Sequence, residues 1–350
     1  MSHGLKRVCF RGNGANFLKR GADLAVLLLG ALGVVLGAKG TDWPEFRGPY
    51  GDGHAQGAGD TKLAGLPVRW SETENVKWKT AIPYRGWSTP VVMAGQVWLT
   101  TATADGHDFF AICVDAKTGQ VLLNEKLFHS ETPERLGNDM NSYATPSPVI
   151  EPGRVYLSFG SYGTACLDTA TWKTLWKRDD LPCSHYRGPS SSPIQFDSLL
   201  ILTMDGADLQ YTVALDKATG QTVWKADRTA LWNPQAAPGK NLTQGDFHKA
   251  HSTPLIANDA GRVLLLSADA NAAYAYDART GVELWRIHHS DFSVAPAPLF
   301  EHGVAFFCNR PHENRDVGCE SRGTGRRDWH ECPVEAGLAR GEVRLADSGG

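Results

Sequence analysis

The sequence predicts an all-β fold, and three observations support this prediction. Glycine (37) and proline (19) are frequent among the 350 residues, and both residue types interrupt helices and favour turns. The chain contains 11 tryptophans but only 4 methionines, and tryptophan packs well on the pleated surface of a sheet. Finally, a short motif typical of a turn between two strands recurs along the chain. Many short strands joined by tight turns are therefore expected.

The recurring motif has the form D-x-x-T-G-x-x-x-W and is complete at Asp216–Trp224 and Asp277–Trp285. Aspartate and threonine side chains bond the amides of a turn, and glycine adopts the positive φ that such a turn needs. The strand that follows then places tryptophan in the core. Each copy therefore predicts one β-hairpin.

Two earlier copies of the motif each depart from it at one position. The copy that starts at Asp115 has Leu123 in place of tryptophan, and the copy that starts at Asp168 has Trp172 in place of glycine but keeps Trp176. The aspartates of the four copies are 53, 48 and 61 residues apart. This spacing is somewhat longer than the ~40–50 residues of a four-stranded propeller blade, and longer loops account for the excess.

A second element recurs in step with the hairpin and precedes an apolar strand each time. Its copies are Ser88-Thr-Pro90-Val91, Ser147-Pro148-Val149, Ser192-Pro193-Ile194, Ser252-Thr-Pro254-Leu255 and Ala297-Pro298-Leu299. We therefore predict a β-propeller of four-stranded antiparallel blades, with about four to five blades present. A solenoid would need a shorter and stricter period, and a sandwich would not repeat its turn chemistry. The repeated tryptophans are expected to pack one blade against the next.

The two complete hairpins, with the Ala-x that precedes each, resemble the pyrroloquinoline-quinone-like propeller repeat, whose signature is A-x-D-x-x-T-G-x-x-x-W. The resemblance covers residues 42–307, and Asp42–Pro49 (DWPEFRGP) is similar to the opening of exported members from planctomycete-type bacteria. It implies a ring of seven or eight blades, more than this chain holds. It does not decide function, because such blades build quinone-dependent dehydrogenases, non-catalytic scaffolds such as the outer-membrane barrel assembly lipoprotein, and sensor domains.

The N-terminus has the charge order of a secretory signal. Basic residues precede an uncharged apolar stretch over residues 24–38, and small residues follow it. This stretch is shorter than the ~20 residues of a membrane-spanning helix, so a permanent anchor is the alternative. We predict a cleaved signal peptide at residues 1–40, a periplasmic or otherwise exported protein, and no stable membrane span after cleavage.

The composition changes abruptly after residue 307. Residues 308–350 contain 7 arginines, no lysine and 3 of the 7 cysteines. We predict a propeller domain at residues 41–307 and an aberrant tail at 308–350, produced by a frameshift or gene-model error, with a divergent or disordered tail as the alternative. Cys308, Cys319, His330 and Cys332 do not have the spacing of a zinc knuckle, and we predict no metal site there.

Charge and cysteine content restrict the function further. Basic (35) and acidic (38) residues are nearly balanced, with a net charge of −3. A surface that neutralises nucleic-acid phosphates needs an excess of basic residues, so no nucleic-acid partner is expected. Only Cys113, Cys166 and Cys183 lie in the body of the chain. Buried free thiols are favoured over a Cys166–Cys183 disulfide, because three scattered cysteines do not make a disulfide framework.

The segments that lead into the innermost strands are expected to converge on one mouth of the propeller. They carry aromatic, guanidinium and imidazole groups that suit a protein, a peptide or a small planar ligand. The candidate ligand-binding residues are Arg85, Trp87, Asn141, Tyr143, His185, Tyr186, Arg187, His248, His251 and Asp291. We predict a non-catalytic binding or scaffold protein with no catalytic residue and no cofactor.

The alternative is an oxidoreductase that depends on pyrroloquinoline quinone and calcium. Asp139 with Asn141, or Asp291, are the side chains that could hold the cation or act as the base. The family's dehydrogenases have a vicinal disulfide over the quinone, and the chain has no vicinal cysteine pair.

Overall fold

The computed structural model describes residues 42–55, 67–137, 139–229, 244–289, 292–308, 316–320 and 325–328. The chain divides into two compact units, residues 1–37 and 38–350, and every described residue belongs to the second. The predicted signal peptide therefore lies outside the described residues. The regular secondary structure of the described part consists of strands and one 3₁₀ turn, η2 (Gln244–Phe247), so the all-β prediction is confirmed.

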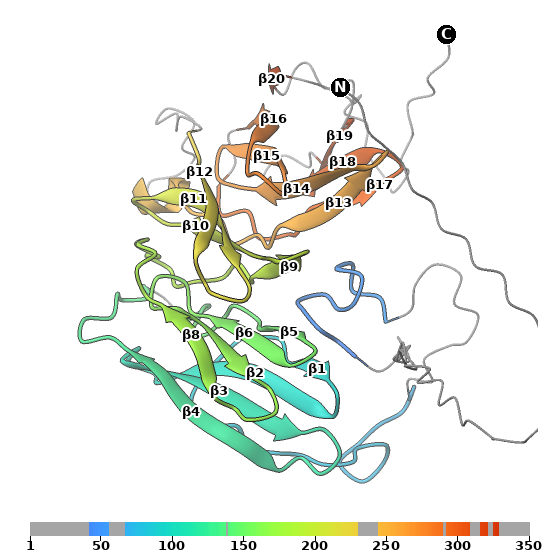
Figure 1. Cartoon of the computed structure of the whole chain (residues 1–350), viewed down its shortest axis with the longest axis vertical. Helices are drawn as coiled ribbons and strands as arrows, with labels where there is room; N and C mark the ends of the chain where they lie inside the picture. Colours follow the sequence, from blue (N-terminus) through green and yellow to red (C-terminus); the bar gives the residue numbers. More distant parts are fainter. Residues whose placement is uncertain are drawn as a thin grey trace, which may run out of the picture. The chain divides into compact units, whose positions relative to one another are not determined.

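Four sheets each contain four consecutive strands paired antiparallel, and these sheets are the predicted blades (Figure 1). Blade 1 contains β1 (Val91–Met93), β2 (Gln96–Ala102), β3 (Asp108–Asp115) and β4 (Val121–His129). Blade 2 contains β5 (Val149–Glu151), β6 (Arg154–Ser158), β7 (Thr164–Asp168) and β8 (Thr174–Arg178). Blade 3 contains β9 (Ile194–Phe196), β10 (Leu199–Asp205), β11 (Gln210–Asp216) and β12 (Thr222–Asp227). Blade 4 contains β13 (Leu255–Asp259), β14 (Arg262–Ala268), β15 (Ala272–Asp277) and β16 (Glu283–His288).

A fifth sheet contains β17 (Leu299–Glu301), β18 (Val304–Cys308) and β19 (Asp316–Glu320). In addition, β20 (Gly325–Asp328) pairs parallel with β16 of blade 4. The fold is a partial β-propeller with four complete blades and the start of another. Residues 308–350 contribute β19 and β20, and the rest of that stretch lies outside the described residues except for Cys308.

The hairpin motif forms the predicted turn in all four blades. Asp216 Oδ1 accepts hydrogen bonds from the Thr219 amide and hydroxyl, both at 2.8 Å, and Gly220 has φ 73°. The other three copies use their aspartate and threonine in the same way. Each copy also has a register shift just before its aspartate, as between Ala214 and Leu215.

The tryptophan that ends one hairpin packs on the glycine turn of the next blade. A Cβ atom on Gly220 would lie 2.7 Å from the Trp176 ring, and one on Gly281 would lie 2.4 Å from the Trp224 ring. Only glycine fits such a turn, because the positive φ and the ring leave no room for a side chain. These contacts confirm that the tryptophans pack blade against blade.

The second recurring element, Ser-Pro or Ser-Thr-Pro before the first and innermost strand of a blade, is called the Ser-x-Pro element and links the blades along these strands. The Thr89 amide donates to Ser147 Oγ (2.9 Å), the Ser147 amide to Ser192 Oγ (3.0 Å) and the Ser192 amide to Thr253 Oγ1 (3.0 Å). One hydroxyl from each of blades 2, 3 and 4 thus accepts a hydrogen bond from the backbone of the preceding blade.

The three cysteines in the body of the chain are buried free thiols, as predicted. Burial raises the pKa of Cys113 and of Cys166 to about 12. These thiols therefore stay protonated and unreactive at neutral pH.

Candidate binding site on the entry loops

The candidate site lies on the loops that lead into the first strand of each blade, which we call the entry loops. They comprise residues 84–87, 139–143, 184–190 and 245–251. Each later entry loop packs against the loop between the second and third strands of the preceding blade. Ser161 donates its amide to His185 Nε2 (2.9 Å), His248 Nδ1 lies 3.0 Å from the Ala207 carbonyl, and the Tyr143 ring lies over Gly106.

Neighbouring entry loops also bond to one another. The Trp87 amide donates to the Ala144 carbonyl next to the second loop (3.0 Å), and Asn141 Nδ2 donates to the Arg187 carbonyl (2.7 Å). His251 Nδ1 lies 2.7 Å from Ser190 Oγ. The four entry loops therefore form one continuous surface, although their residues are far apart in the sequence.

Large side chains project from this surface at its first two loops. Tyr84 is 48% exposed and stacks on Phe110 with ring centroids 4.0 Å apart. Trp87 is 51% exposed and has the Arg85 guanidinium 5.9 Å from its ring centroid. Met140 is 84% exposed. Tyrosine, tryptophan, methionine and arginine are the side chains most enriched in protein interfaces.

Other predicted site residues hold the loops together. Asn141 Nδ2 donates to the third entry loop, and its Oδ1 accepts from the Ser142 amide and from the Thr145 hydroxyl. Tyr143 is buried and its hydroxyl donates to the Glu134 carbonyl (2.6 Å). The side chains of Asn141 and Tyr143 are thus committed to the shape of the surface.

His185 is buried and neutral. Burial lowers its pKa well below the ordinary value, and the neighbouring Lys249 and His251 lower it further. Because Nε2 accepts a hydrogen bond from the Ser161 amide, the ring carries its proton on Nδ1, which lies 3.4 Å from Lys249 Nζ. His185 therefore anchors the third entry loop to the loop between β6 and β7 of blade 2.

Beneath the third and fourth entry loops lies a buried ionic cluster of Asp205, Arg228, Lys249 and Asp269. Arg228 contacts both Asp205 oxygens (2.7 and 2.8 Å) and lies 3.2 Å from Asp269, and Lys249 donates to the Asp205 carbonyl (2.9 Å). Burial raises the pKa of both aspartates and lowers that of Lys249. The cluster joins blades 3 and 4 and makes the floor of the loop surface rigid.

Of the three side chains named for a calcium and quinone site, two lie in the second entry loop. Both hydrogen-bonding groups of Asn141 are occupied within the loops, and Asp139 is exposed to solvent. Asp291 lies outside the described residues. In the part of the chain that the structure describes, no group of three or more histidine, cysteine, aspartate or glutamate side chains is placed to hold a metal ion.

The structure thus places nine of the ten predicted site residues in the four entry loops, but their exposure differs. Arg85 and Trp87 are exposed, Tyr143 and His185 are buried, and the remaining five, Asn141, Tyr186, Arg187, His248 and His251, are partly exposed. The Arg187 guanidinium lies over the Tyr186 ring at 4.8 Å.

Sequence reasoning passed over Tyr84, Met140 and Lys249 as site residues, although all three belong to the segments that it identified. Tyr84 and Met140 are exposed, whereas Lys249 is buried. The sequence pattern of these irregular loops carries no signal for either property.

The fold and this loop surface define a repeat β-propeller with an exposed aromatic face. The family model described as outer membrane protein assembly factor BamB matches residues 68–226 and 209–346. These matches span most of the chain, so the chain belongs to this family of pyrroloquinoline-quinone-like repeat propellers. The second match extends into the stretch after residue 307, where the composition changes.

Three solved structures illustrate the similarity. BamB from Moraxella catarrhalis is 17% identical over 67% of this chain and 58% of its own, with a TM-score of 0.45. Quinohemoprotein alcohol dehydrogenase from Comamonas testosteroni is 15% identical over 69% of this chain and 42% of its own, with a TM-score of 0.45. A europium-containing methanol dehydrogenase is 12% identical over 66% of this chain and 50% of its own, with a TM-score of 0.43. The chain thus spans less than two thirds of each of these proteins.

No curated protein sequence matches the chain. Among the described residues, no helix has the length and apolar character to cross a membrane.

Proposed function

We propose that this protein is an exported, non-catalytic propeller that binds a protein, a peptide or a small planar ligand through its entry-loop surface. The observation that supports this function best is the exposure of Tyr84, Trp87 and Met140, together with the Arg85 guanidinium beside the Trp87 ring. Exposed groups of these types, held on a rigid base, are typical of the energetically dominant residues of an interface.

A polypeptide partner is favoured over a small ligand. The aromatic and thioether groups stand out from the surface at 48–84% exposure, whereas small-molecule sites enclose most of their ligand. The family to which the chain belongs is described as an assembly factor. The apolar stretch after the basic N-terminus supports export to the periplasm or beyond.

The bonded loops and the ionic cluster supply the pre-organisation that such a surface needs. Asn141, His185 and Lys249 keep the second, third and fourth entry loops in one arrangement. A surface that is already ordered loses less conformational entropy when a partner binds.

No observation favours the quinone-dependent oxidoreductase in particular. Its candidate ligand Asn141 is committed to loop contacts and its candidate base Asp139 is solvated. We therefore propose that the protein works without quinone or metal.

Site-specific photo-crosslinking tests the proposal in cells. We expect benzoylphenylalanine at position 87 or 140 to give a discrete crosslinked product that mass spectrometry identifies. The same group at Trp70, which is 75% exposed but lies outside the entry loops, should give none. Trp87→Ala should then weaken binding of the identified partner at least tenfold, because one central aromatic residue contributes about 2 kcal/mol or more.

A dye-reduction assay with pyrroloquinoline quinone and calcium provides the opposing test. The proposal would be overturned by turnover that Asp139→Asn abolishes, combined with identical crosslinking from positions 70 and 87.

A further inference from the structure

Residues 43–51, which we call the strap, lie along the innermost strands of the blades (Figure 1). Trp43 pairs with Val92 of β1 through two backbone hydrogen bonds of 2.7 and 2.8 Å. The Pro44 carbonyl accepts from the Ile150 amide of β5 (2.8 Å). The Glu45 carboxyl group lies against the Gln195 backbone amide of β9, and this amide lowers its pKa. Three consecutive strap residues therefore bind three consecutive blades.

The three donors are equivalent positions of the repeat. Val92, Ile150 and Gln195 each stand two residues after the proline that opens the blade. Their amides point away from the second strand of the blade, along an edge that would otherwise be unpaired. The strap supplies an acceptor to this edge in each of the three blades.

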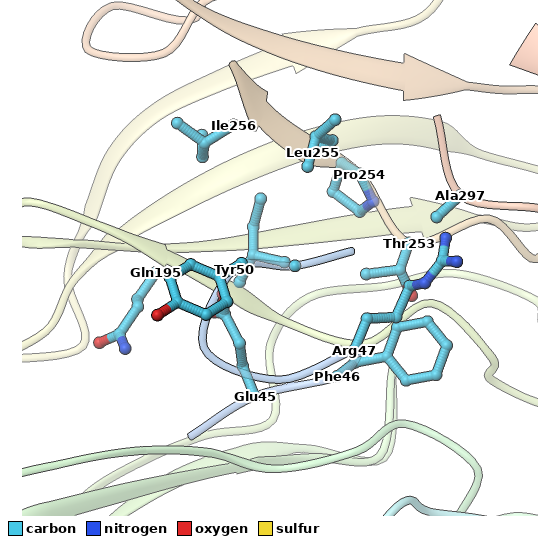
Figure 2. Close-up of a pocket in the computed structure, with 12 residues that line it drawn as sticks. Glu45, Phe46, Arg47, Tyr50, Gln195, Thr253, Pro254, Leu255, Ile256 and Ala297 are labelled. Carbon is cyan, nitrogen blue, oxygen red and sulfur yellow. The ribbon is translucent and has the colours of Figure 1, made fainter. Parts of the chain in front are cut away.

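Of the three acceptors, only the carboxylate of Glu45 can change its charge. The other two are backbone carbonyls. Glu45 Oε2 is buried and has no hydrogen-bond partner among the described residues. The carboxyl group lines a cavity of about 70 Å³ between the strap and blades 3 and 4 (Figure 2).

The surroundings of Glu45 offer little to stabilise a negative charge. The charged or titratable groups that line the cavity, Arg47 and Tyr50, both belong to the strap, and the blades contribute Gln195, Thr253 and apolar residues. In Figure 2, Glu45 and Tyr50 lie on the side of Gln195, whereas the Arg47 guanidinium lies on the side of Thr253 and Ala297.

We propose that Glu45 is a pH-sensitive latch that holds the strap against blade 3 when its carboxyl group is protonated and releases it when the group ionises. Burial raises the pKa of Glu45 to about 7, and the hydrogen bond from Gln195 opposes this only in part. A carboxyl group whose pKa is raised in the docked state favours docking at low pH. This stabilisation of the docked strap is lost as the pH rises from 4.5, the ordinary pKa of glutamate, through about 7, the pKa of Glu45 in the docked state.

Release of the strap has a structural consequence for the blades. The amides of Val92, Ile150 and Gln195 would then form a row of free donors on the innermost strands. An extended peptide binds to such an edge by adding a strand to it. The strap thus occupies a peptide-binding edge in the docked state and uncovers it in the released state.

Hydrogen exchange of the full chain, measured by mass spectrometry between pH 5.5 and 7.5, tests the latch. The exchange rates, corrected for intrinsic exchange, give the equilibrium constant for opening of residues 43–51. We expect this constant to increase on the order of tenfold over this pH range. Glu45→Gln should abolish the increase, because the amide keeps the shape without the charge. Glu125→Gln, at an exposed position of β4, should leave the increase unchanged.

The proposal is wrong if Glu45→Gln opens with the same pH dependence as the native chain, or if the native strap shows no dependence. A titration of ¹³C-labelled glutamate by NMR serves as a second test that needs no folded variant. The latch is supported if the native chain has a glutamate with a pKa near 7 whose resonance is absent from Glu45→Gln. Where that variant does not fold, the latch is supported if this resonance changes over the same pH range in which the strap opens. Titration of every glutamate near 4.5 contradicts it.

Discussion

At the scale of single residues, the buried ionic cluster shows how this protein tolerates charge in its interior. Arg228 is buried, yet its guanidinium bonds Asp205 through both oxygens, lies beside Asp269, and also donates to Thr212 and Ser267. Burial lowers the pKa of Arg228, but the two carboxylates more than offset this, so that the pKa is raised and the group stays charged. Arg228 therefore opposes the effect of burial on Asp205 and Asp269, although the pKa of each aspartate remains raised.

We predict that Arg228→Met lowers the free energy of unfolding by about 3–5 kcal/mol, because it leaves two buried carboxylates without a partner. The loss should be larger at pH 8 than at pH 5. Without the guanidinium, the pKa of each aspartate lies further above its unfolded value, and such a group destabilises the fold increasingly as the pH rises. Urea unfolding at the two pH values measures both effects.

Arg279→Met is the matched control for this prediction. Arg279 pairs with Asp197 on the surface, where both side chains are more than half exposed. Its removal should cost roughly 0–1 kcal/mol and be insensitive to pH over the same range. Equal losses for the two variants would show that the buried cluster contributes nothing beyond a surface pair.

At the scale of elements, the contact between a tryptophan and the next glycine turn explains the two irregular copies of the hairpin motif. Blade 1 has Leu123 where the other blades have tryptophan, and blade 2 has Trp172 where the others have glycine. Both side chains pack in the same apolar cluster between blades 1 and 2. Between blades 1 and 2, the tryptophan therefore comes from the turn of blade 2 and not from the last strand of blade 1. Trp172 adopts φ 60° in this turn.

We predict that the two substitutions compensate each other. Leu123→Trp alone should destabilise the protein by about 1–3 kcal/mol because the site is already filled by Trp172. Trp172→Gly alone should cost about 3–5 kcal/mol because it empties the site. The double variant recreates the arrangement of Trp224 on Gly281 and should recover most of the loss. Thermal unfolding in a double-mutant cycle measures the coupling, and additive losses would contradict a shared site.

The same elements show which features of the fold and of the site can be predicted from the sequence and which cannot. The hairpins at Asp216 and Asp277 were predictable because turn chemistry depends on local residues, and the confirmed blades follow from their repetition. The partnership of Leu123 and Trp172 was not predictable, since it joins two blades. The site was predictable only as a set of loops. Whether a loop residue such as Asn141 faces solvent or a neighbouring loop depends on contacts with distant residues, which leave no periodic pattern in the sequence.

At the scale of the whole molecule, a series of hydrogen bonds through the Ser-x-Pro elements joins each blade to the next. We call this series of hydrogen bonds the relay. Ser147, Ser192 and Thr253 each accept one backbone amide from the preceding blade. In a protein built of repeats, stability depends on the contacts between neighbouring units as much as on the units themselves. The recurrence of a hydroxyl residue before proline therefore has a reason in the assembly of the blades as well as in the start of each strand.

The relay predicts that Ser192 affects the joint between blades 2 and 3 more than it affects its own blade. Ser192→Ala leaves the buried Ser147 amide without an acceptor and should cost about 1–3 kcal/mol. Ser192→Thr should cost less than half as much, because blade 4 uses Thr253 in the same role. Ser198→Ala, at an exposed position of the same blade, should be neutral.

Hydrogen exchange at the Ser147 amide distinguishes this role of Ser192 from a general loss of packing. This amide should lose protection in Ser192→Ala and keep it in Ser192→Thr, and unchanged protection in both variants would refute the relay.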